Sequence, residues 1–320
     1  MNRTRVWHEA LHRGSPTRLG RNGVLVLRGM STLRPATQEI LHRYGGGGAR
    51  ASTENIPLRM PSVFLSHGSP MAALADAEDR YFREIQEFFG ALPRPRAVVV
   101  ASAHGLSPLE LVEVNSAARP SLVYDFGGFP ASLYQIQYPC PGDPLLAQQI
   151  ADMARGAGFT VQLNERAGID HGVWVPLRIA YPAADVPVIQ ISLPYGDRPH
   201  QAMRLGQALA PLRKEGVLLL GSGGLVHNLG QLTWHAKHGS PRAWALEFEQ
   251  WVQKALQEKR VDDLLHFSEL APHAGQAHPT VEHFYPLLFT LGGSLPGDDA
   301  WSIYEGFEYE TLSMFSFCLA

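Results

Sequence analysis

The sequence has few cysteines and no long apolar run. Its 320 residues include only two cysteines, Cys140 and Cys318, which lie far apart and outside any CxxC pattern. A disulfide framework is therefore excluded, and two reduced, inert thiols in a reducing, cytoplasmic compartment are expected. No run reaches the ~18 apolar residues that span a bilayer. The N-terminus also lacks the apolar core of a secretory signal.

Acidic residues are scarce in the first part of the chain. Overall, 18% of the residues are charged and the net charge is −3 with neutral histidines, which gives no reason to expect nucleic acid or an anionic membrane as a partner. Residues 1–59, however, contain ten arginines, no lysine and three acids, and so carry +7. The remaining residues carry −10. The small net charge of the whole chain therefore combines a basic segment with an acidic one.

A domain boundary is predicted near residue 60. Residues 45–59 have the glycine-rich composition of a linker, and a strand-like run begins at Met60. We expect residues 1–59 to be a basic, weakly structured extension, or the product of a start codon assigned too far upstream, and residues 60–320 to form the folded domain. The extension also has the composition of a mitochondrial transit peptide, but Pro16 and the glycines at 45–48 interrupt any long amphipathic helix.

After residue 60, continuous apolar runs alternate with amphipathic stretches. The apolar runs suit strands that are buried on both faces, and this alternation is typical of parallel sheets. We therefore expect an α/β fold, a single domain with a mostly parallel central sheet flanked by helices. The expected strands are 61–66, 97–103, 186–193 and 216–220, with closing strands in 306–319; the expected helices are 71–92, a segment from 143 to 156 or 158, 200–214, 241–258 and about 279–292.

Three histidines follow expected strands in a context of small residues. His67 comes directly after the first strand, His104 after the second, and His227 after the 216–220 strand and a glycine-rich turn. Ligands of open parallel sheets bind beyond the carboxyl ends of the strands, so these side chains should meet at one edge. Imidazole is the usual nitrogen ligand of Zn and Fe(II). The pattern predicts a metal site there.

Further histidines have a less certain place. His273, His278 and His283 follow one another at steps of five residues, which do not share a helical face, and spacing alone does not choose among them. His171 stands beside Asp170 in a glycine-containing loop. A histidine next to a carboxylate suits a proton shuttle, although a capping role explains it equally well.

Five sequence motifs, which occur in the same order as in a known family, contain most of these residues. They cover residues 60–71, 98–104, 124–130, 170–174 and 226–229. The chain resembles the DODA-type (4,5-DOPA) extradiol aromatic ring-opening dioxygenases of the LigB-like, class III extradiol superfamily. The resemblance extends over residues 60–320 and includes none of residues 1–59. It implies a LigB-like fold and makes residues 60–320 the catalytic domain.

The resemblance also implies a metal and its ligands. It predicts one divalent metal per chain, Fe(II) for activity with Zn(II) as the alternative occupant, and it selects His283 rather than His273 or His278. The residues that match metal ligands of the family are His67, His104, His227 and His283. The catalytic residues it implies are His171, as acid/base, and His227, whose position serves as a base in the wider superfamily and as a ligand in the DODA-type branch.

Two departures from the family pattern concern the substrate. Gly105 stands where the family often has an aromatic residue, and Tyr124 stands where another residue, such as histidine, is common. Both positions are where substrate would sit, which leaves open a catechol other than DOPA. We expect Tyr124, Asp125 and Phe129 to bind the substrate; further ring-packing candidates are Phe126 and Tyr195.

The resemblance therefore predicts a metal-dependent oxidoreductase. The enzyme would insert both atoms of O2 into a catechol-type, DOPA-like substrate and give a muconic semialdehyde-type product. Its partners would be a small aromatic diol and O2, with no nucleic acid or membrane, and the oligomeric state stays open. One alternative is a non-enzymatic metal-site relative that serves protein recognition. The other is a zinc hydrolase that uses Glu282 or Asp170 as a base beside an open zinc site, although no HExxH motif is present.

Overall fold

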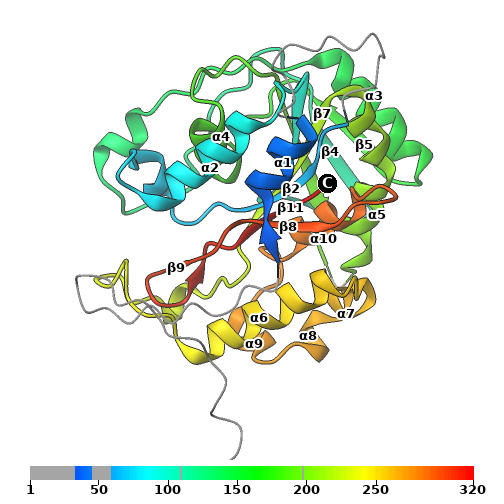
Figure 1. Cartoon of the computed structure of the whole chain (residues 1–320). Helices are drawn as coiled ribbons and strands as arrows, with labels where there is room; N and C mark the ends of the chain where they lie inside the picture. Colours follow the sequence, from blue (N-terminus) through cyan, green and yellow to red (C-terminus); the bar gives the residue numbers. More distant parts are fainter. Residues whose placement is uncertain (1–32, 45–58, 109, 197) are drawn as a thin grey trace, which may run out of the picture. The chain divides into compact units, whose positions relative to one another are not determined.

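A nine-stranded sheet forms the centre of the computed structural model, which describes residues 33–44, 59–108, 110–196 and 198–320 (Figure 1). The strand order is β1-β8-β11-β2-β7-β3-β6-β4-β5. Most neighbours pair in parallel, whereas β11 is antiparallel to β2 and β8, and β4 is antiparallel to β6. The strands are β1 Arg34–Pro35, β2 Ser62–Ser66, β3 Ala97–Ser107, β4 Leu111–Asn115, β5 Thr160–Asn164, β6 Val188–Pro194, β7 Val217–Gly223, β8 Ala300–Tyr304 and β11 Ser316–Leu319; β9 Phe307–Glu308 and β10 Leu312–Ser313 form a separate hairpin. The predicted α/β class is confirmed.

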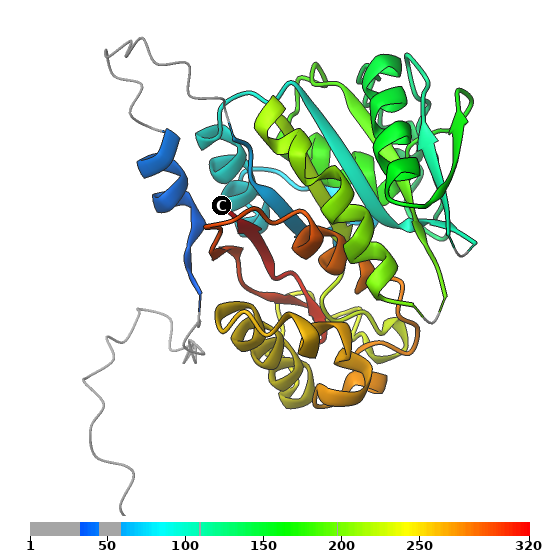
Figure 2. The same ribbon diagram turned by 90° about the vertical axis from the view of Figure 1, so that its right-hand side faces the viewer.

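Helices cover both faces of the sheet (Figure 2). One face packs against α1, α2 and α4, and the other against α3, α5 and α10. The shorter helices α7, α8 and α9 lie with α6 at one end of the sheet (Figure 1). The helices are α1 Ala36–Tyr44, α2 Arg80–Ala91, α3 Pro144–Gly156, α4 His171–Ala180, α5 His200–Leu209, α6 Ala243–Gln257, α7 Val261–Leu265, α8 Phe267–Leu270, α9 Ala274–Ala277 and α10 Tyr285–Gly292, and the 3-10 turns are Pro70–Leu74, Ala131–Gln135, Ala210–Glu215 and Leu229–Gln231. In the described part of the chain, none of these helices is long and apolar enough to cross a bilayer.

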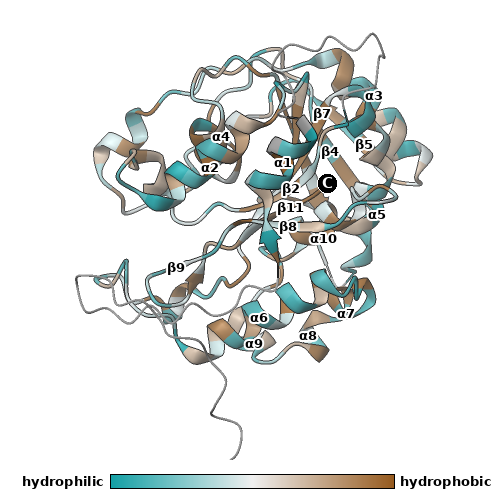
Figure 3. Ribbon diagram, viewed as in Figure 1, coloured by the Kyte–Doolittle hydropathy of each residue, from teal (hydrophilic) through white to brown (hydrophobic). Residues whose placement is uncertain are grey.

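The central strands are apolar throughout because both of their faces are covered. In β3, Val98 and Val100 belong to the core under α2 and α4, whereas Val99 and Ala101 belong to the core under α3 and α5. Figure 3 shows this as brown strands at the centre, with teal on the outer sides of the surrounding helices. Burial on both faces is the property that made these strands recognisable in the sequence.

A capping residue sets the start of the first long helix. The predicted helix 71–92 is a 3-10 turn followed by α2, with an extended break between them. Asp79 accepts a hydrogen bond from the backbone N–H of Phe82 and so starts α2. The helix expected from residue 143 is confirmed as α3, in which Asp143 accepts from the N–H of Leu146 and Pro144 is the first helical residue.

The predicted N-terminal extension contains a strand and a helix in its described part. Strand β1 pairs in parallel with β8, and the Arg34 guanidinium lies 4.5 Å from the centre of the Trp301 ring. Ala36 and Ile40, one helical turn apart on α1, are fully buried in the core under α2. Residues 33–44 are thus attached to the domain by a paired strand and by two buried side chains that share one face of α1. Residues 1–32 and 45–58 lie outside the described residues, and the domain boundary at residue 60 stays a prediction.

Candidate metal centre

Five histidines from five separate elements lie together at the carboxyl edge of the central strands. His67 follows β2, His104 lies in β3, His171 is the first residue of α4, His227 follows β7, and His283 precedes α10. The rings of four of them lie against one another. Ring centres are 4.1–5.6 Å apart for His67 with His104, His171 and His283, and for His104 with His171 and His283. The His227 ring stacks on that of His283 at 3.3 Å. The topology therefore assembles the histidines that the sequence singled out.

An irregularity in β3 carries His104 into this cluster. The pairing of β3 with β6 shifts between Ala101 and Leu106, so that more residues lie on β3 than on its partner. Such a bulge redirects side chains away from the regular alternation. The strand therefore continues past the predicted end at residue 103, with His104 inside the irregular stretch. Gly172 lets α4 approach at this point, because a Cβ there would lie 2.5 Å from the Ser102 hydroxyl.

The Nδ1 atom of His67 is held by a hydrogen bond, and its Nε2 atom faces the cluster, 3.3 Å from the Nε2 atom of His104. The Nδ1 atom of His67 lies 3.1 Å from the Ser222 hydroxyl, and that hydroxyl donates its hydrogen to the carbonyl oxygen of Gly172. A hydroxyl has one hydrogen, so Ser222 accepts from His67, and the His67 proton resides on Nδ1. The lone pair of Nε2 is then directed toward the cluster, as a metal ligand requires.

His283 has the same arrangement with a different partner. Its Nδ1 atom lies 3.0 Å from Glu282 Oε1, a carboxylate oxygen that only accepts, so Nδ1 carries the proton. Its Nε2 atom is buried and has no hydrogen-bond partner among the described residues. An orphaned buried acceptor is costly unless something binds it. A cation at this point would satisfy it.

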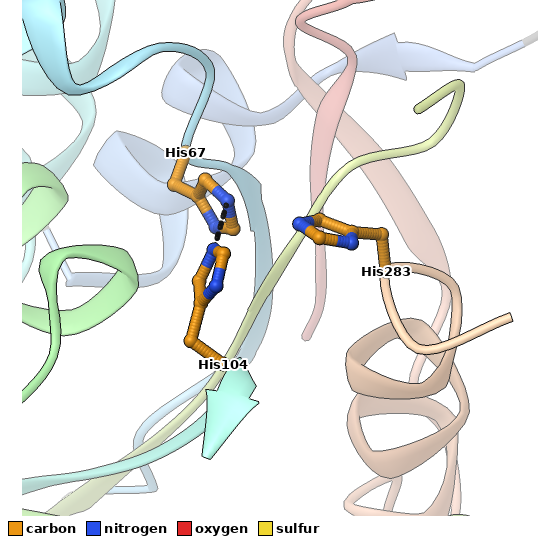
Figure 4. Close-up of side chains that lie close together, drawn as sticks. All are labelled: His67, His104 and His283. Carbon is orange, nitrogen blue, oxygen red and sulfur yellow. Dashed lines mark hydrogen bonds between the residues drawn. The ribbon is translucent and has the colours of Figure 1, made fainter. Parts of the chain in front are cut away.

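The donor set fits a single divalent metal. The Nε2 atoms of His67 and His104 lie 3.3 Å apart (Figure 4), and the ligand atoms of His67, His104 and His283 all fall within 4.8 Å of one another. Two nitrogens bound to one tetrahedral metal at about 2.0–2.1 Å would be about 3.4 Å apart. Burial and the neighbouring histidines hold the pKa of His67 and of His283 well below the usual value, and burial together with His171 lowers the pKa of His104 to about 4. The three imidazoles are therefore neutral, as metal ligands must be.

His227 lies at the margin of this group. It forms a second group of potential ligand atoms with Glu282 and His283, within the same 4.8 Å limit, but does not belong to the group formed by His67, His104 and His283. Burial lowers the pKa of His227 to about 4 although the Glu282 carboxylate opposes this. A neutral imidazole in this place suits either a further ligand or a base.

His171 is held in place by the carboxylate of Asp125. Its Nδ1 atom lies 2.9 Å from Asp125 Oδ1, and its backbone N–H donates to the same oxygen at 3.0 Å. Partial burial works against ionisation of Asp125, but the hydrogen bonds from His171 outweigh it and lower the pKa of Asp125. The Nδ1 proton of His171 therefore points to Asp125, and its Nε2 is free to exchange a proton.

The predicted substrate-binding residues have different surroundings. Asp125 contacts His171, as described. The Tyr124 hydroxyl donates to the carbonyl oxygen of Ile136 at 2.6 Å, so this group is occupied within the loop. Phe129 packs against Phe126 at 5.5 Å, and it is Phe126 whose ring lies 5.5 Å from that of His171. Substrate binding by Tyr124, Asp125 and Phe129 stays a prediction.

Several polar neighbours of the cluster have hydrogen-bond partners that the sequence did not predict. Asp170 accepts from the Ser102 hydroxyl at 2.8 Å and from the Gln190 amide, and burial raises its pKa to about 6. Ser102 and Ser222 stand in the small-residue runs around the site histidines, and only their proximity in the fold gives them a role. Of the remaining histidines, His278 donates from Nε2 to the carbonyl oxygen of Leu225, and His273 pairs with Glu247; neither belongs to the cluster.

Comparisons with known proteins agree with this geometry. Residues 61–320 match the model of the catalytic LigB subunit of aromatic ring-opening dioxygenase. The chain is 39% identical over 262 residues to a protein of Escherichia coli K12 named 4,5-DOPA dioxygenase extradiol, covering 81% of this chain and 94% of that protein. A protein of the same name from Beta vulgaris is 37% identical over 268 residues, 80% of this chain and 95% of its own length.

A solved structure extends the likeness to the fold. A crystal structure of an uncharacterized protein from Escherichia coli K12 superposes with a TM-score of 0.68 at 34% sequence identity, over 82% of this chain and 100% of that one. The predicted family is confirmed. The chain belongs to the LigB family of class III extradiol dioxygenases and is an extradiol aromatic ring-opening dioxygenase.

Proposed function

We propose that this enzyme opens the ring of a DOPA-like catechol, with Fe(II) held by His67, His104 and His283 and with His227 beside them. The observation that carries this proposal is the convergence of three neutral imidazoles, one of which has a buried Nε2 atom without a partner in the described part of the chain. The relatives named 4,5-DOPA dioxygenase extradiol support the substrate class.

The metal would bind the reactants, and neighbouring side chains orient its histidine ligands. When bound, Fe(II) would draw a catechol and O2 together and lower the pKa of the phenol. Zn(II) is the alternative occupant, because it binds imidazole at least as tightly. Ser222 and Glu282 orient the ligands through the Nδ1 atoms of His67 and His283.

Proton transfer falls to His171. Its Nε2 atom accepts a phenolic proton, while Asp125 holds the Nδ1 proton in place and stabilises the imidazolium that forms. The same Nε2 then returns the proton as the ring opens. Both oxygen atoms of O2 enter the product, a muconic semialdehyde, so no further reductant is needed. His227 is the second group able to hold a proton here.

The two alternatives, a zinc hydrolase and a non-enzymatic protein that serves protein recognition, have less support. Asp170 as the base of a zinc hydrolase is disfavoured, since its oxygens accept hydrogen bonds from Ser102 and Gln190. Glu282 accepts from His283 and from the Thr280 hydroxyl. A protein-recognition role would not require the His171–Asp125 pair. The two free, buried thiols, Cys140 and Cys318, support the predicted reducing, cytoplasmic location.

The test is direct. The protein is reconstituted with Fe(II) without oxygen, mixed with a panel of catechols that includes DOPA, and exposed to air. We expect oxygen uptake and a yellow ring-fission product with DOPA or a related catechol, and none with the Zn(II) form. Absence of oxygen uptake with every catechol of the panel would overturn the proposal.

A further inference from the structure

A polar pocket adjoins the metal centre at His104. Its volume is about 320 Å³, and its lining comes from the second half of β3, from β4 and β6, and from residues 167–168 just before α4. His104 belongs to this lining and also to the metal-ligand group. The pocket therefore shares one wall residue, His104, with the metal-ligand group.

The pocket lies on a polar side of the sheet, near the edge formed by β4 and β5. In β4, Leu111, Glu113 and Asn115 line it, whereas the alternate residues Val112 and Val114 are fully buried in the core on the opposite face. In β6 the same alternation places Gln190 and Ser192 in the pocket. The β4 positions that line the pocket pair with Thr160, Gln162 and Asn164 of β5, and Thr160 and Gln162 are exposed. This side of the sheet therefore faces solvent near its edge, and its polar residues leave a space that a polar group can enter.

Most of these polar groups already have partners. The Gln190 amide bonds Asp170 on both of its ends. The Asn115 amide donates to the carbonyl oxygens of Ala167 and Gly168. The Ser192 hydroxyl donates to that of Ser107. These three pairs use the groups that would otherwise be available to a ligand.

Glu113 is the exception. Its backbone N–H donates to the Ser192 hydroxyl at 2.7 Å, but its carboxylate has no hydrogen bond or ion pair with any described residue. The side chain is only half-buried and lines the pocket. It thus gives the pocket one uncompensated negative charge and free acceptor atoms. Such a group favours a cationic donor and repels an anion.

Gly105 lies next to His104 in the pocket lining. A Cβ atom at this position would lie 2.6 Å from the Gln190 amide nitrogen, which is fixed by its bond to Asp170. Any larger residue would push into the lining at this point. The glycine therefore keeps the pocket open beside the metal ligand.

We propose that this pocket is a substrate subsite for a protonated amine on the side chain of the catechol, with Glu113 as its counter-ion. The inference rests on the proposed function, because the histidine cluster must hold the diol. The volume suffices for a short alkylamine, since it equals about ten times the ~30 Å³ that a water occupies in the liquid. A catechol with a carboxylate alone in this place would be disfavoured.

Binding without turnover tests the proposal. The Fe(II)-loaded protein is titrated by calorimetry, in the absence of oxygen, with a catechol that carries an aminoethyl substituent and with the matched ethyl catechol. The variants are Glu113→Gln, which keeps the shape and removes the charge, and Glu165→Gln, which removes an exposed charge near residues 167–168 but outside the pocket lining.

The wild type should bind the amine more tightly than the ethyl compound. Glu113→Gln should weaken amine binding by about tenfold or more, as expected for a hydrogen bond to a charged group. Binding of the ethyl compound should change by less than about twofold, and Glu165→Gln should leave both unchanged, as an exposed charge does. Equal dissociation constants for the two catechols in the wild type, or equal effects of both variants, would overturn the subsite. An amine preference without ring cleavage of any catechol would sink the proposed function and leave the subsite standing.

Discussion

The Asp125 carboxylate accepts two hydrogen bonds from His171, one from the ring at 2.9 Å and one from the backbone at 3.0 Å. Both arrive at the same oxygen, Oδ1. The backbone bond fixes the carboxylate at the first residue of α4, and the ring bond fixes the tautomer of His171. The arrangement makes Asp125 a positioning residue for the proton-transfer step.

Replacement of Asp125 by asparagine should therefore impair turnover and spare the metal. The amide keeps the shape but loses the charge that stabilises the imidazolium, and general acid–base catalysis contributes about 10²–10⁴-fold to rate. We expect kcat to fall by about 10²-fold or more with unchanged iron content. Steady-state kinetics and metal analysis measure the two effects. Asp152→Asn, on an exposed part of α3, is the control, and loss of iron from Asp125→Asn would contradict the assignment.

Metal retention should depend on His283 and, less strongly, on Glu282. His283→Ala removes a ligand and should abolish stoichiometric metal binding. Glu282→Gln keeps the ligand but weakens the bond that orients it, and changes of this kind typically cost about 10–100-fold in metal affinity. Competition with a chelator of known affinity gives both values. If His283→Ala retained one metal per chain, His283 would have no place among the ligands.

His227 should matter more for turnover than for metal binding. Its ring stacks on His283, but its nitrogens lie outside the group that His67, His104 and His283 form. We expect His227→Ala to keep most of its iron and to lose turnover, as removal of a base would do. Metal content and single-turnover kinetics on the same preparation separate the two roles. Loss of iron in parallel with activity would make His227 a ligand instead.

The strand-end histidines were predictable because topology alone brings them together. His67 and His227 follow β2 and β7, which are parallel neighbours, so their proximity needs no side-chain detail. His171 and His283 required the family resemblance, because both lie at helix starts whose positions sequence periodicity does not fix. Only the fold pairs Asp125 with His171, across 46 residues of chain.

The edge of the sheet was less predictable for a physical reason. Strand β1 has only two residues, too few for a pattern, and the pairing of β1 and β8 depends on contacts distant in sequence. The pocket beside Gly105 was hidden for the same reason. Its polar lining is drawn from three strands, and each contributes only one to three residues.

Stability should fall with rising pH because of one buried glutamate. Glu249 in α6 is 4% exposed and accepts a hydrogen bond from the Ser313 hydroxyl at 2.6 Å. Burial raises its pKa from 4.5 to about 8, although the bond from Ser313 opposes this. The folded protein thus keeps a proton that the unfolded chain releases above about pH 4.5. The stabilisation is complete below that pH and is lost by up to about 1.4 kcal/mol per pH unit as the pH rises to about 8.

Glu249→Gln should remove this dependence, since the amide does not titrate. Urea unfolding at about pH 5 and about pH 8 gives the free energies for the wild type and the variant. We expect the free energy of unfolding of the wild type to fall between about pH 5 and about pH 8, and that of the variant to fall less, so the variant becomes more stable relative to the wild type at the higher pH. Glu269→Gln, at an exposed glutamate, is the control. An unchanged difference between Glu249→Gln and the wild type at both pH values would show that Glu249 is ionised in the fold.

The N-terminal segment should stabilise the domain without contributing to the metal centre. Ile40 is fully buried in the core under α2, so Ile40→Ala should cost about 2–5 kcal/mol in the free energy of unfolding, whereas Gln38→Ala on the exposed side of α1 should change it little. Deletion of residues 1–59 should lower stability at least as much and leave the histidine cluster able to bind metal. Urea unfolding and metal titration measure the two effects. Equal stabilities of Ile40→Ala and Gln38→Ala would mean that α1 is only a loosely attached tail.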